Sequence, residues 1–350
     1  MRKEASLDMW KTLYNLTAEL KELQPWDDLG ALDFIGIQEN GREEPVFVRV
    51  MGQKNAKEAK GITMYDGTLG LGYLQQLVRA PETCMSQEYA VMDQQSLMLC
   101  FGERMEVPEE QRAVIKELGL KFAGKGNWPF FLSFQTRFTP WTPDADEVRL
   151  MAETLVQVIE AVKALREERV TVKFDEGEFC FRYFDVDQLN WMTAPARMPL
   201  VNLEVDPLVI TDELFLHRLK KQPVNDAELL LDFLYMNAAI EDEQYDRPLN
   251  PLVFLVFDKV HSSIVHMDMI SPDEEETEQS AEFLLAYIEE AGRPRSISVR
   301  NPYVITELKD TCEKLGIELR EEKLPELDLI CEQFMEQFTA GIGNHEGQEE

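Results

Sequence analysis

The sequence predicts an α+β fold, with an antiparallel sheet and helices in the N-terminal part and a smaller α/β domain with a partly parallel sheet near the C-terminus. In the stretch 33–74, short apolar runs alternate with the turn pairs Asn40-Gly41 and Asp66-Gly67, a pattern typical of an antiparallel meander. From residue 252 onward, strand patterns alternate with helix patterns, which favours parallel pairing. A chain of 350 residues also exceeds the usual size of a single core, so we expect two domains.

Apolar spacing and capping residues place the elements of the N-terminal part in order. A helix begins after Ser6 and ends at Pro25, because Trp10 and the leucines that follow it recur at helical spacing. The meander supplies strands over 34–37, 46–50 and 62–65. Further helices are expected over 71–78, 108–118 and 144–165, and further strands over 96–101 and 130–138.

The rest of the chain contains one hairpin, one linker and the alternating C-terminal elements. The hairpin is expected to join 170–174 to 178–184, and Asn225 or Asp226 would cap a helix that runs to Ile240. The acidic, proline-containing segment 241–251 is the best candidate for a linker. We expect strands over 200–205, 252–257, 264–270, 296–299 and 317–320, and helices from 211 and over 272–291, 302–315 and 324–338.

These elements divide the chain into four parts. They are an N-terminal α+β domain over 1–166, a connecting hairpin with helices over 167–246, a C-terminal α/β domain over 247–340 and a tail over 341–350. We expect the tail to be disordered. The helix over 144–165 could cover the preceding sheet or connect domains, and its wide apolar stripe favours the first interpretation.

The chain is strongly acidic. It contains 35 Lys and Arg residues against 66 Asp and Glu residues, which gives a formal net charge of −31. Because such a surface repels phosphates and anionic lipid headgroups, we expect neither direct nucleic-acid binding nor membrane binding. A basic or polar protein surface is the more suitable partner, and a mimic of nucleic acid that binds a basic protein is a further interpretation.

Cysteine usage and hydropathy indicate the compartment. The 5 cysteines are scattered without a C-x-x-C pair, which is typical of reduced, buried thiols. No apolar run resembles a signal segment or is long enough to cross a bilayer, so we expect a cytoplasmic protein. The sequence pattern calls for no cofactor.

Short motifs in both halves resemble an uncharacterised bacterial two-domain family. In the N-terminal half the motifs are Pro25-Trp26, the strand that begins DFIG at Asp33, the segment VRVMG that ends at Gly52, and GITMYDGTLGL over 61–71. In the C-terminal half they are Arg247-Pro248, Gly292-Arg293-Pro294, Leu315-Gly316-Ile317 and Leu324-Pro325. The resemblance spans nearly the whole chain. It implies a division into two domains of unknown function and supplies no mechanism.

Glycines after the third strand form a candidate binding loop. The segment GTLGLG over 67–72 would follow a strand and open a helix, where free backbone amides can hold a phosphate. The candidate binding residues are Gly52, Tyr65, Gly67 and Gly70. The spacing reverses the dinucleotide fingerprint, so we favour a turn followed by a helix start. Similarly, GLKFAGKG over 119–126 has Gly where a phosphate-binding loop needs Ser or Thr.

A second candidate site lies on the first two strands expected in the C-terminal domain. His266 and Asp268 would project from one face of a strand, with Asp258 at the end of its neighbour, and such side chains can bind a divalent metal. The order of elements resembles part of a ribonuclease-H-like nuclease domain, in which an acid on the first strand, here Asp258, helps to hold Mg²⁺. The position after the strand SISV, where such nucleases place a second acid, is occupied by Arg300-Asn301.

We therefore expect a non-catalytic binding or adaptor module without a metal site. The acidic run DEEETE over 273–278 favours a solvated helix cap over a calcium cluster, since carboxylates are stabilised at helix N-termini. The alternative is a divalent-metal-dependent hydrolase or nuclease whose catalytic candidates are Asp258, His266 and Asp268.

Overall fold

A computed structural model describes residues 2–53, 59–201, 205 and 207–330, and it confirms the α+β class. The chain forms two compact units. The first unit contains residues 1–75, 94–202 and 243–247, and the second contains 76–93, 203–242 and 248–350. Within the described residues, no helix is both long and apolar enough to cross a membrane. Most of the strand expected over 200–205, the end of the helix expected over 324–338 and the tail fall outside the described residues.

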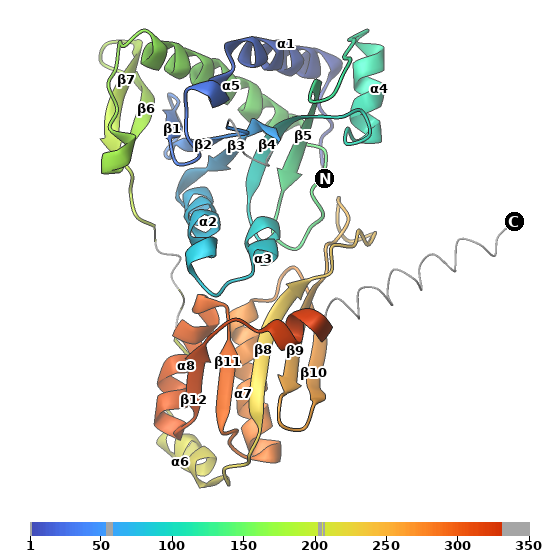
Figure 1. Ribbon diagram of the computed structural model, residues 1–350, viewed down its shortest axis with the longest axis vertical. Helices are drawn as coiled ribbons and strands as arrows, with labels where there is room; N and C mark the ends of the chain where they lie inside the picture. Colours follow the sequence, from blue (N-terminus) through green and yellow to red (C-terminus); the bar gives the residue numbers. More distant parts are fainter. Residues whose placement is uncertain (1, 54–58, 202–204, 206, 331–350) are drawn as a thin grey trace, which may run out of the picture. The chain divides into compact units, whose positions relative to one another are not determined.

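The described part of the first unit contains a seven-stranded sheet with the order β5-β4-β3-β2-β1-β6-β7 (Figure 1). All neighbours are antiparallel except β1 and β6, which are parallel. The expected meander therefore forms the centre of this sheet. The strands are β1 Phe34–Gln38, β2 Val46–Met51, β3 Lys60–Asp66, β4 Ser96–Gly102, β5 Trp128–Phe134, β6 Glu178–Asp185 and β7 Asn190–Arg197.

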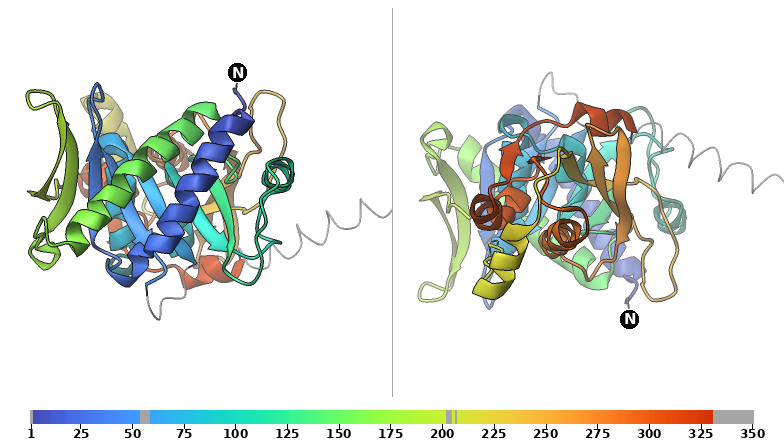
Figure 2. Two further views of the ribbon diagram at one scale, coloured as in Figure 1. Left: turned by 90° about the horizontal axis from the view of Figure 1, so that it is seen from above. Right: turned by 90° about the horizontal axis from the view of Figure 1, so that it is seen from below.

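Helices α1 (Leu7–Leu23) and α5 (Ala145–Arg166) lie side by side across one face of this sheet (Figure 2). Their apolar stripes pack against the inward side chains of the strands in one continuous core. The long helix thus covers the sheet, as its wide stripe indicated. The other helical segments of this unit are 3₁₀ turns at Pro25–Asp27 and Phe174–Glu176, α4 (Glu109–Glu117) and the start of α2 (Gly67–Arg79).

The hairpin predicted for 170–184 uses a different pair of strands. Residues 170–174 form no strand, and β6 pairs instead with the following strand β7. The turn between them is stabilised by Asp185, whose carboxylate accepts hydrogen bonds from the backbone amides of Asp187 and Gln188. The prediction that residues 170–174 form the partner strand of β6 was therefore wrong. The turn at Gly177 does form, but the hairpin closes through the turn at Asp185.

The described part of the second unit contains a five-stranded mixed sheet with the order β10-β9-β8-β11-β12. Strands β10, β9 and β8 are antiparallel neighbours, whereas β8, β11 and β12 are parallel. The strands are β8 Glu228–Tyr235, β9 Leu252–Asp258, β10 Ser263–Ile270, β11 Ser296–Val299 and β12 Glu318–Glu321. Its helices include α3 Gln87–Met92, α6 Glu213–Lys221, α7 Glu276–Ala291 and α8 Pro302–Leu315, with a 3₁₀ turn at Ala80–Glu82.

The helix expected from Asn225 to Ile240 was wrong, because these residues contain the central strand β8. Its sequence ELLLDFLY is apolar on both faces, so it shows neither the alternation of a half-buried strand nor a clear helical stripe. One face, including Phe233, packs in the core with α7 and α8. The other face contacts Leu324, which directly precedes a helical stretch over 325–330, and Leu327, which lies within that stretch.

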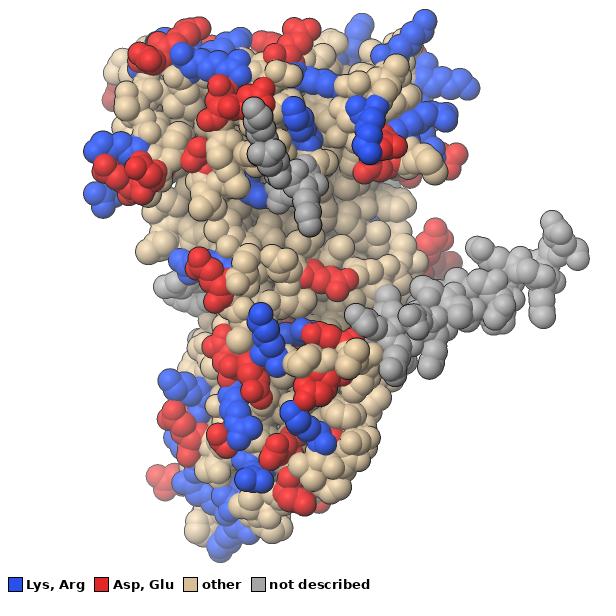
Figure 3. Space-filling model, viewed as in Figure 1, with Lys and Arg blue, Asp and Glu red and all other residues tan. Residues whose placement is uncertain are grey.

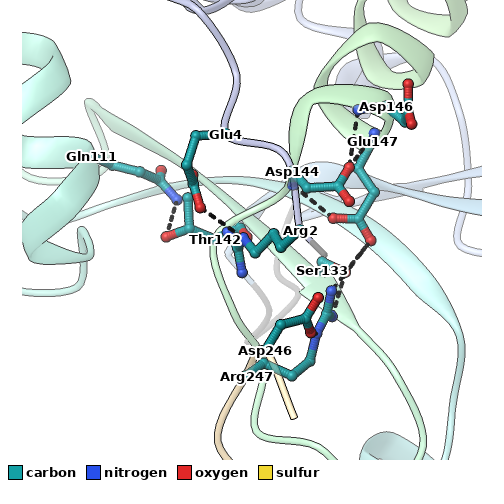
Figure 4. A network of polar contacts seen from close by, with 10 residues as sticks. All are labelled: Arg2, Glu4, Gln111, Ser133, Thr142, Asp144, Asp146, Glu147, Asp246 and Arg247. Carbon is teal, nitrogen blue, oxygen red and sulfur yellow. Dashed lines mark hydrogen bonds and ion pairs between the residues drawn. The ribbon is translucent and has the colours of Figure 1, made fainter.

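The expected linker over 241–251 is anchored to the first unit by Arg247 (Figure 4). The Arg247 side chain is only 4% exposed. Its Nη1 donates to Ser133 Oγ at 3.1 Å, and its Nη2 lies 3.9 Å from Glu147 Oε1. The Glu147 carboxylate also accepts from Ser133 Oγ and from the backbone amide of Asp144, as part of the capping box of α5. The linker is thus tied to the start of a core helix.

Candidate functional site

A cavity of about 980 Å³ lies within the second unit. Its walls come from the ends of β8 and β9, the segment 80–89, one side of β10 and the helical stretch over 325–330. Apolar side chains line much of it, including Phe233, Leu234, Met236, Val253, Leu255 and Met267. Polar and charged side chains line the rest, including Gln87, Glu88, Asn237, Arg300, Lys323 and Asp328. A pocket that combines apolar lining with polar groups is a common form of binding site.

Arg300 forms a buried ion-pair bridge at this cavity. It follows β11 directly, its side chain is 8% exposed, and its Nε donates to Asp232 Oδ2 at 2.6 Å. Its Nη1 donates to Asp328 Oδ1 at 2.7 Å. Asp232 lies on β8 and Asp328 on the helical stretch over 325–330, so the guanidinium connects the sheet to the segment that covers it. We call this trio the Arg300 clamp.

The surroundings of the clamp shift the pKa of its buried acid. Burial raises the pKa of Asp232 to about 6, and this rise is opposed by the Arg300 guanidinium and by a backbone hydrogen bond. Near pH 7 the carboxylate is therefore ionised and compensates the charge of Arg300, which keeps its proton at any ordinary pH. The clamp presents a neutralised cation rather than a reactive group.

Asp258, the acid that the sequence predicted on the first strand, does not line the cavity. Asp258 ends β9 and is paired in register with Ser263 on β10 and with Leu229 on β8. Its carboxylate accepts from the amides of Val260 and His261 and contacts His261 Nδ1 at 2.6 Å. Burial acts to raise the pKa of Asp258, but these hydrogen bonds outweigh it and lower the pKa. In this position Asp258 stabilises the turn between β9 and β10.

The other two metal candidates do not join Asp258. The ring of His266 packs against Phe254 and Phe283, with ring centroids 5.1 and 5.2 Å apart. Asp268 is exposed and lies opposite Phe254 in the strand register. Throughout the described residues, no group of three or more His, Cys, Asp and Glu side chains could hold a metal ion.

The residues that sequence reasoning missed are Asp232 and Asp328, the two partners of Arg300. In chain order the first strand of this sheet is β8, which contains Asp232, and not β9, which ends at Asp258. A single aspartate within the apolar run LLLDFLY was the available signal, since a buried charge requires a partner. The position of the second acid is occupied by Arg300, which pairs with Asp232.

The glycine-rich loop already contains an anionic group. Glu44 accepts hydrogen bonds from the Thr68 amide at 2.9 Å and from the Thr68 hydroxyl at 2.6 Å, at the N-terminus of α2. The Glu44 carboxylate thus occupies the Thr68 amide, one of the amides at this helix start that could otherwise bind a phosphate.

The glycine and tyrosine candidates of this loop have packing roles. A Cβ on Gly70 would lie 2.8 Å from the Tyr65 carbonyl carbon, and one on Gly52 would lie 2.5 Å from the Cα of Lys60. Tyr65 itself is buried and contacts Gln94 through its hydroxyl. Gly67 has a positive φ of 67°, which suits the turn between β3 and α2.

The acidic run over 273–278 is not uniformly solvated. Glu276 is buried in the first turn of α7, where the Tyr89 hydroxyl donates to it at 2.6 Å. Asn301, the N-cap of α8, also contacts it at 3.3 Å. One acid of the run therefore belongs to a buried polar network near the cavity, while its exposed neighbours are typical of a cap.

The fold and the site define a two-unit α+β protein with a clamped cavity in its second unit. Residues 10–182 match a domain of unknown function, DUF7309, and residues 215–335 match another, DUF6930. The chain belongs to a two-domain family of unknown function that combines these domains. No curated protein matches the chain.

Two solved structures are partly similar to the chain. One is a simian T-cell lymphotropic virus intasome in complex with PP2A regulatory subunit B56 gamma, with 13% identity, a TM-score of 0.22, and coverage of 32% of this chain and 41% of that one. The other is the HTLV-2 integrase catalytic core domain in complex with magnesium, with 12% identity, a TM-score of 0.24, and coverage of 35% and 79%. The chain thus spans less than half of the first of these, and we base no inference on similarity at this level.

Proposed function

We propose that the chain is a non-catalytic binding module whose second unit receives an apolar segment of a protein partner in its cavity. The observation that supports this most strongly is the Arg300 clamp, which places a permanent cation between Asp232 and Asp328. The carboxylates that could serve a metal-dependent reaction are thereby bonded to a guanidinium, and Asp258 is bonded within a turn.

The lining of the cavity indicates the kind of partner. Ile264 and Met267 are 50% and 47% exposed, although they line it. Together with Met85 and Met236 they supply flexible apolar surface, which suits large aliphatic or aromatic side chains. The net charge of −31 favours a partner segment with basic flanking residues.

A peptide selection tests this proposal. Random 12-residue peptides displayed on phage are selected on the full chain, and enriched peptides are measured by fluorescence anisotropy. We expect enrichment of Leu, Met or Phe, and an affinity at least about tenfold lower for Ile264→Glu, which buries a charge beside the ligand. Leu214→Glu is the matched control, because Leu214 is 82% exposed on α6 and outside the cavity lining. Equal affinities for the two variants would refute the cavity as the binding site.

The alternative, a divalent-metal-dependent hydrolase or nuclease, predicts a different result. It requires saturable binding of Mn²⁺ or Mg²⁺ that is lost on Asp232→Asn or Asp258→Asn. Calorimetric titration of the purified chain with each metal measures this directly. We expect no saturable heat at sub-millimolar metal, and a stoichiometric site abolished by either substitution would favour the enzyme.

A further inference from the structure

Strand β10 forms one outer edge of the second sheet, and within the described residues no further strand pairs with its outer side. It has eight residues with no proline and no lysine, and its exposed side chains include Ile264, Val265, Met267 and Met269. Proteins normally protect such edges with charges, prolines, short strands or covering segments, because free backbone groups pair readily with another strand. Along β10, Asp268 is the only Asp, Glu, Lys or Arg.

The other three sheet edges of the described chain are protected. Strand β12 has four residues, three of them charged. Strand β7 contains Pro195 and ends in Arg197. Strand β5 is partly covered by Trp141, which exchanges backbone hydrogen bonds with Ser133 in both directions, at 2.7 and 3.0 Å. The contrast singles out β10 as an edge suited to pairing.

We propose that β10 pairs with β10 of a second copy of this chain in an antiparallel, two-fold arrangement centred on Met267. This register places His266 opposite Asp268 of the partner subunit, twice, on one face. On the other face Met267 lies opposite Met267 of the partner subunit, and Val265, at the irregular step of β10, has Met269 of the partner subunit as its partner position. Antiparallel strands are stabilised when a hydrogen-bond donor lies opposite an acceptor and when apolar residues lie opposite each other.

Neighbouring registers are less suitable. A two-fold axis at Asp268 places two carboxylates directly opposite each other, which destabilises a strand pair. A two-fold axis at His266 places Asp268 opposite Ile264, next to the irregular register between Ile264 and His266. The Met267-centred register keeps its three central pairs in the regular part of the strand, after the irregular step at Val265, and pairs the only carboxylate of β10 with an imidazole.

The dimer is expected to be weak and to depend on salt. A single strand pair buries less surface than a standard interface, so we expect a dissociation constant on the order of micromolar. Two chains of net charge −31 repel each other, and added salt screens this repulsion. Dimerisation is therefore expected to strengthen between about 0.05 and 0.5 M NaCl.

Sedimentation equilibrium of the full chain tests the dimer. A monomer of 40.5 kDa gives a dimer of twice that mass. We expect Asp268→Lys to raise the dissociation constant at least about tenfold and Asp268→Glu to change it less than about threefold. Asp187→Lys is the matched control: Asp187 is exposed in the turn after β6, and its substitution changes the net charge equally. A chain that stays monomeric at about 100 µM in high salt, or equal effects of the two lysine variants, would overturn the proposal.

Cysteine crosslinking tests the register without relying on affinity. Under diamide, which oxidises two thiols to a disulfide and is itself reduced, Met267→Cys is expected to give a covalent dimer because the two positions face each other. Val265→Cys is expected to give none above the unsubstituted chain, since its partner position is Met269. Crosslinking through position 265 but not 267 would exclude this register. Met267 also lines the cavity, whereas Asp268 does not, so the Asp268 variants test the dimer separately from the proposed partner site.

Discussion

At the scale of single residues, the clamp formed by Arg300, Asp232 and Asp328 explains how a charge is accommodated beside an apolar cavity. Asp232 is 3% exposed and its neighbours along β8 are apolar, so its carboxylate depends on the guanidinium for compensation. The same contacts fix the segment over 325–330 to the sheet. The bridge therefore shapes the cavity wall without providing a reactive group.

The clamp predicts a non-additive pair of substitutions. Arg300→Met is expected to lower the free energy of unfolding by about 3 kcal/mol, because it leaves Asp232 buried without its cation. Asp232→Leu with Arg300→Met is expected to recover most of this loss, since the buried charge is also removed. Urea unfolding measures both variants, with Arg295→Met as the exposed control. Additive losses would show that the buried charge is not the cause.

A second buried acid, Glu307 on α8, predicts a pH dependence. Burial raises its pKa to about 7, although its contact with Ser280 at 3.1 Å opposes the rise. Since the folded-state pKa lies above the unfolded value, the folded chain binds a proton that the unfolded chain has lost between about pH 4.5 and 7. This contribution to stability is present below that window and is lost as the pH rises through it.

The test compares the wild-type chain with Glu307→Gln by urea unfolding at pH 5 and pH 8. We expect the wild type to lose up to about 2 kcal/mol relative to the variant over this range, after allowing for partial solvation of the group. Glu307→Gln keeps an acceptor for Ser280 and removes the titration. A constant difference between the two chains would contradict the assignment.

At the scale of elements, Arg247 fixes the linker against the start of α5. Arg247→Met is expected to lower the free energy of unfolding by about 2 kcal/mol, because it removes the donor to Ser133 and the cation near Glu147. Hydrogen exchange should report faster opening of amides at the beginning of α5 and in β5. Arg149→Met, on the exposed face of the same helix, is expected to change neither. Unchanged exchange in Arg247→Met would show that the anchor is dispensable.

Elements with a strong local signal could be predicted from the sequence. The cap at Asp144 and the apolar stripe that follows it identified α5, and Asn40-Gly41 identified the β1–β2 hairpin. Strand β8 could not be placed, because burial on both faces removes the period that distinguishes strand from helix. The parallel pairing of β6 with β1 could not be placed either, because it joins distant parts of the chain and local turn chemistry does not specify it.

The candidate site was predictable only in part, for the same reason. Arg300 was noted only as the residue that stands where an acid would follow the strand SISV, a position that depends on one local strand. Its bonds to Asp232 and Asp328 join three separate elements, and no spacing along the sequence indicates them. His266 and Asp268 do lie on one strand, but His266 meets aromatic rings instead of acids.

At the scale of the whole molecule, the acidic charge is the dominant feature of the composition, with a formal net charge of −31. On the face shown in Figure 3, Lys and Arg side chains are interspersed with Asp and Glu over both units. Because such a surface repels polyanions, we expect recognition to depend on local apolar features. The cavity and the edge of β10 are two such features in the described part of the second unit.

Hydrogen–deuterium exchange of the full chain, with and without a selected apolar peptide, tests the central claim most directly because it locates the binding site. If the cavity receives the partner segment, the bound peptide slows exchange in residues 233–237 and 253–255 and in the wall segment 80–89. Protection confined to the first unit, with unchanged exchange in these three segments, would contradict the account.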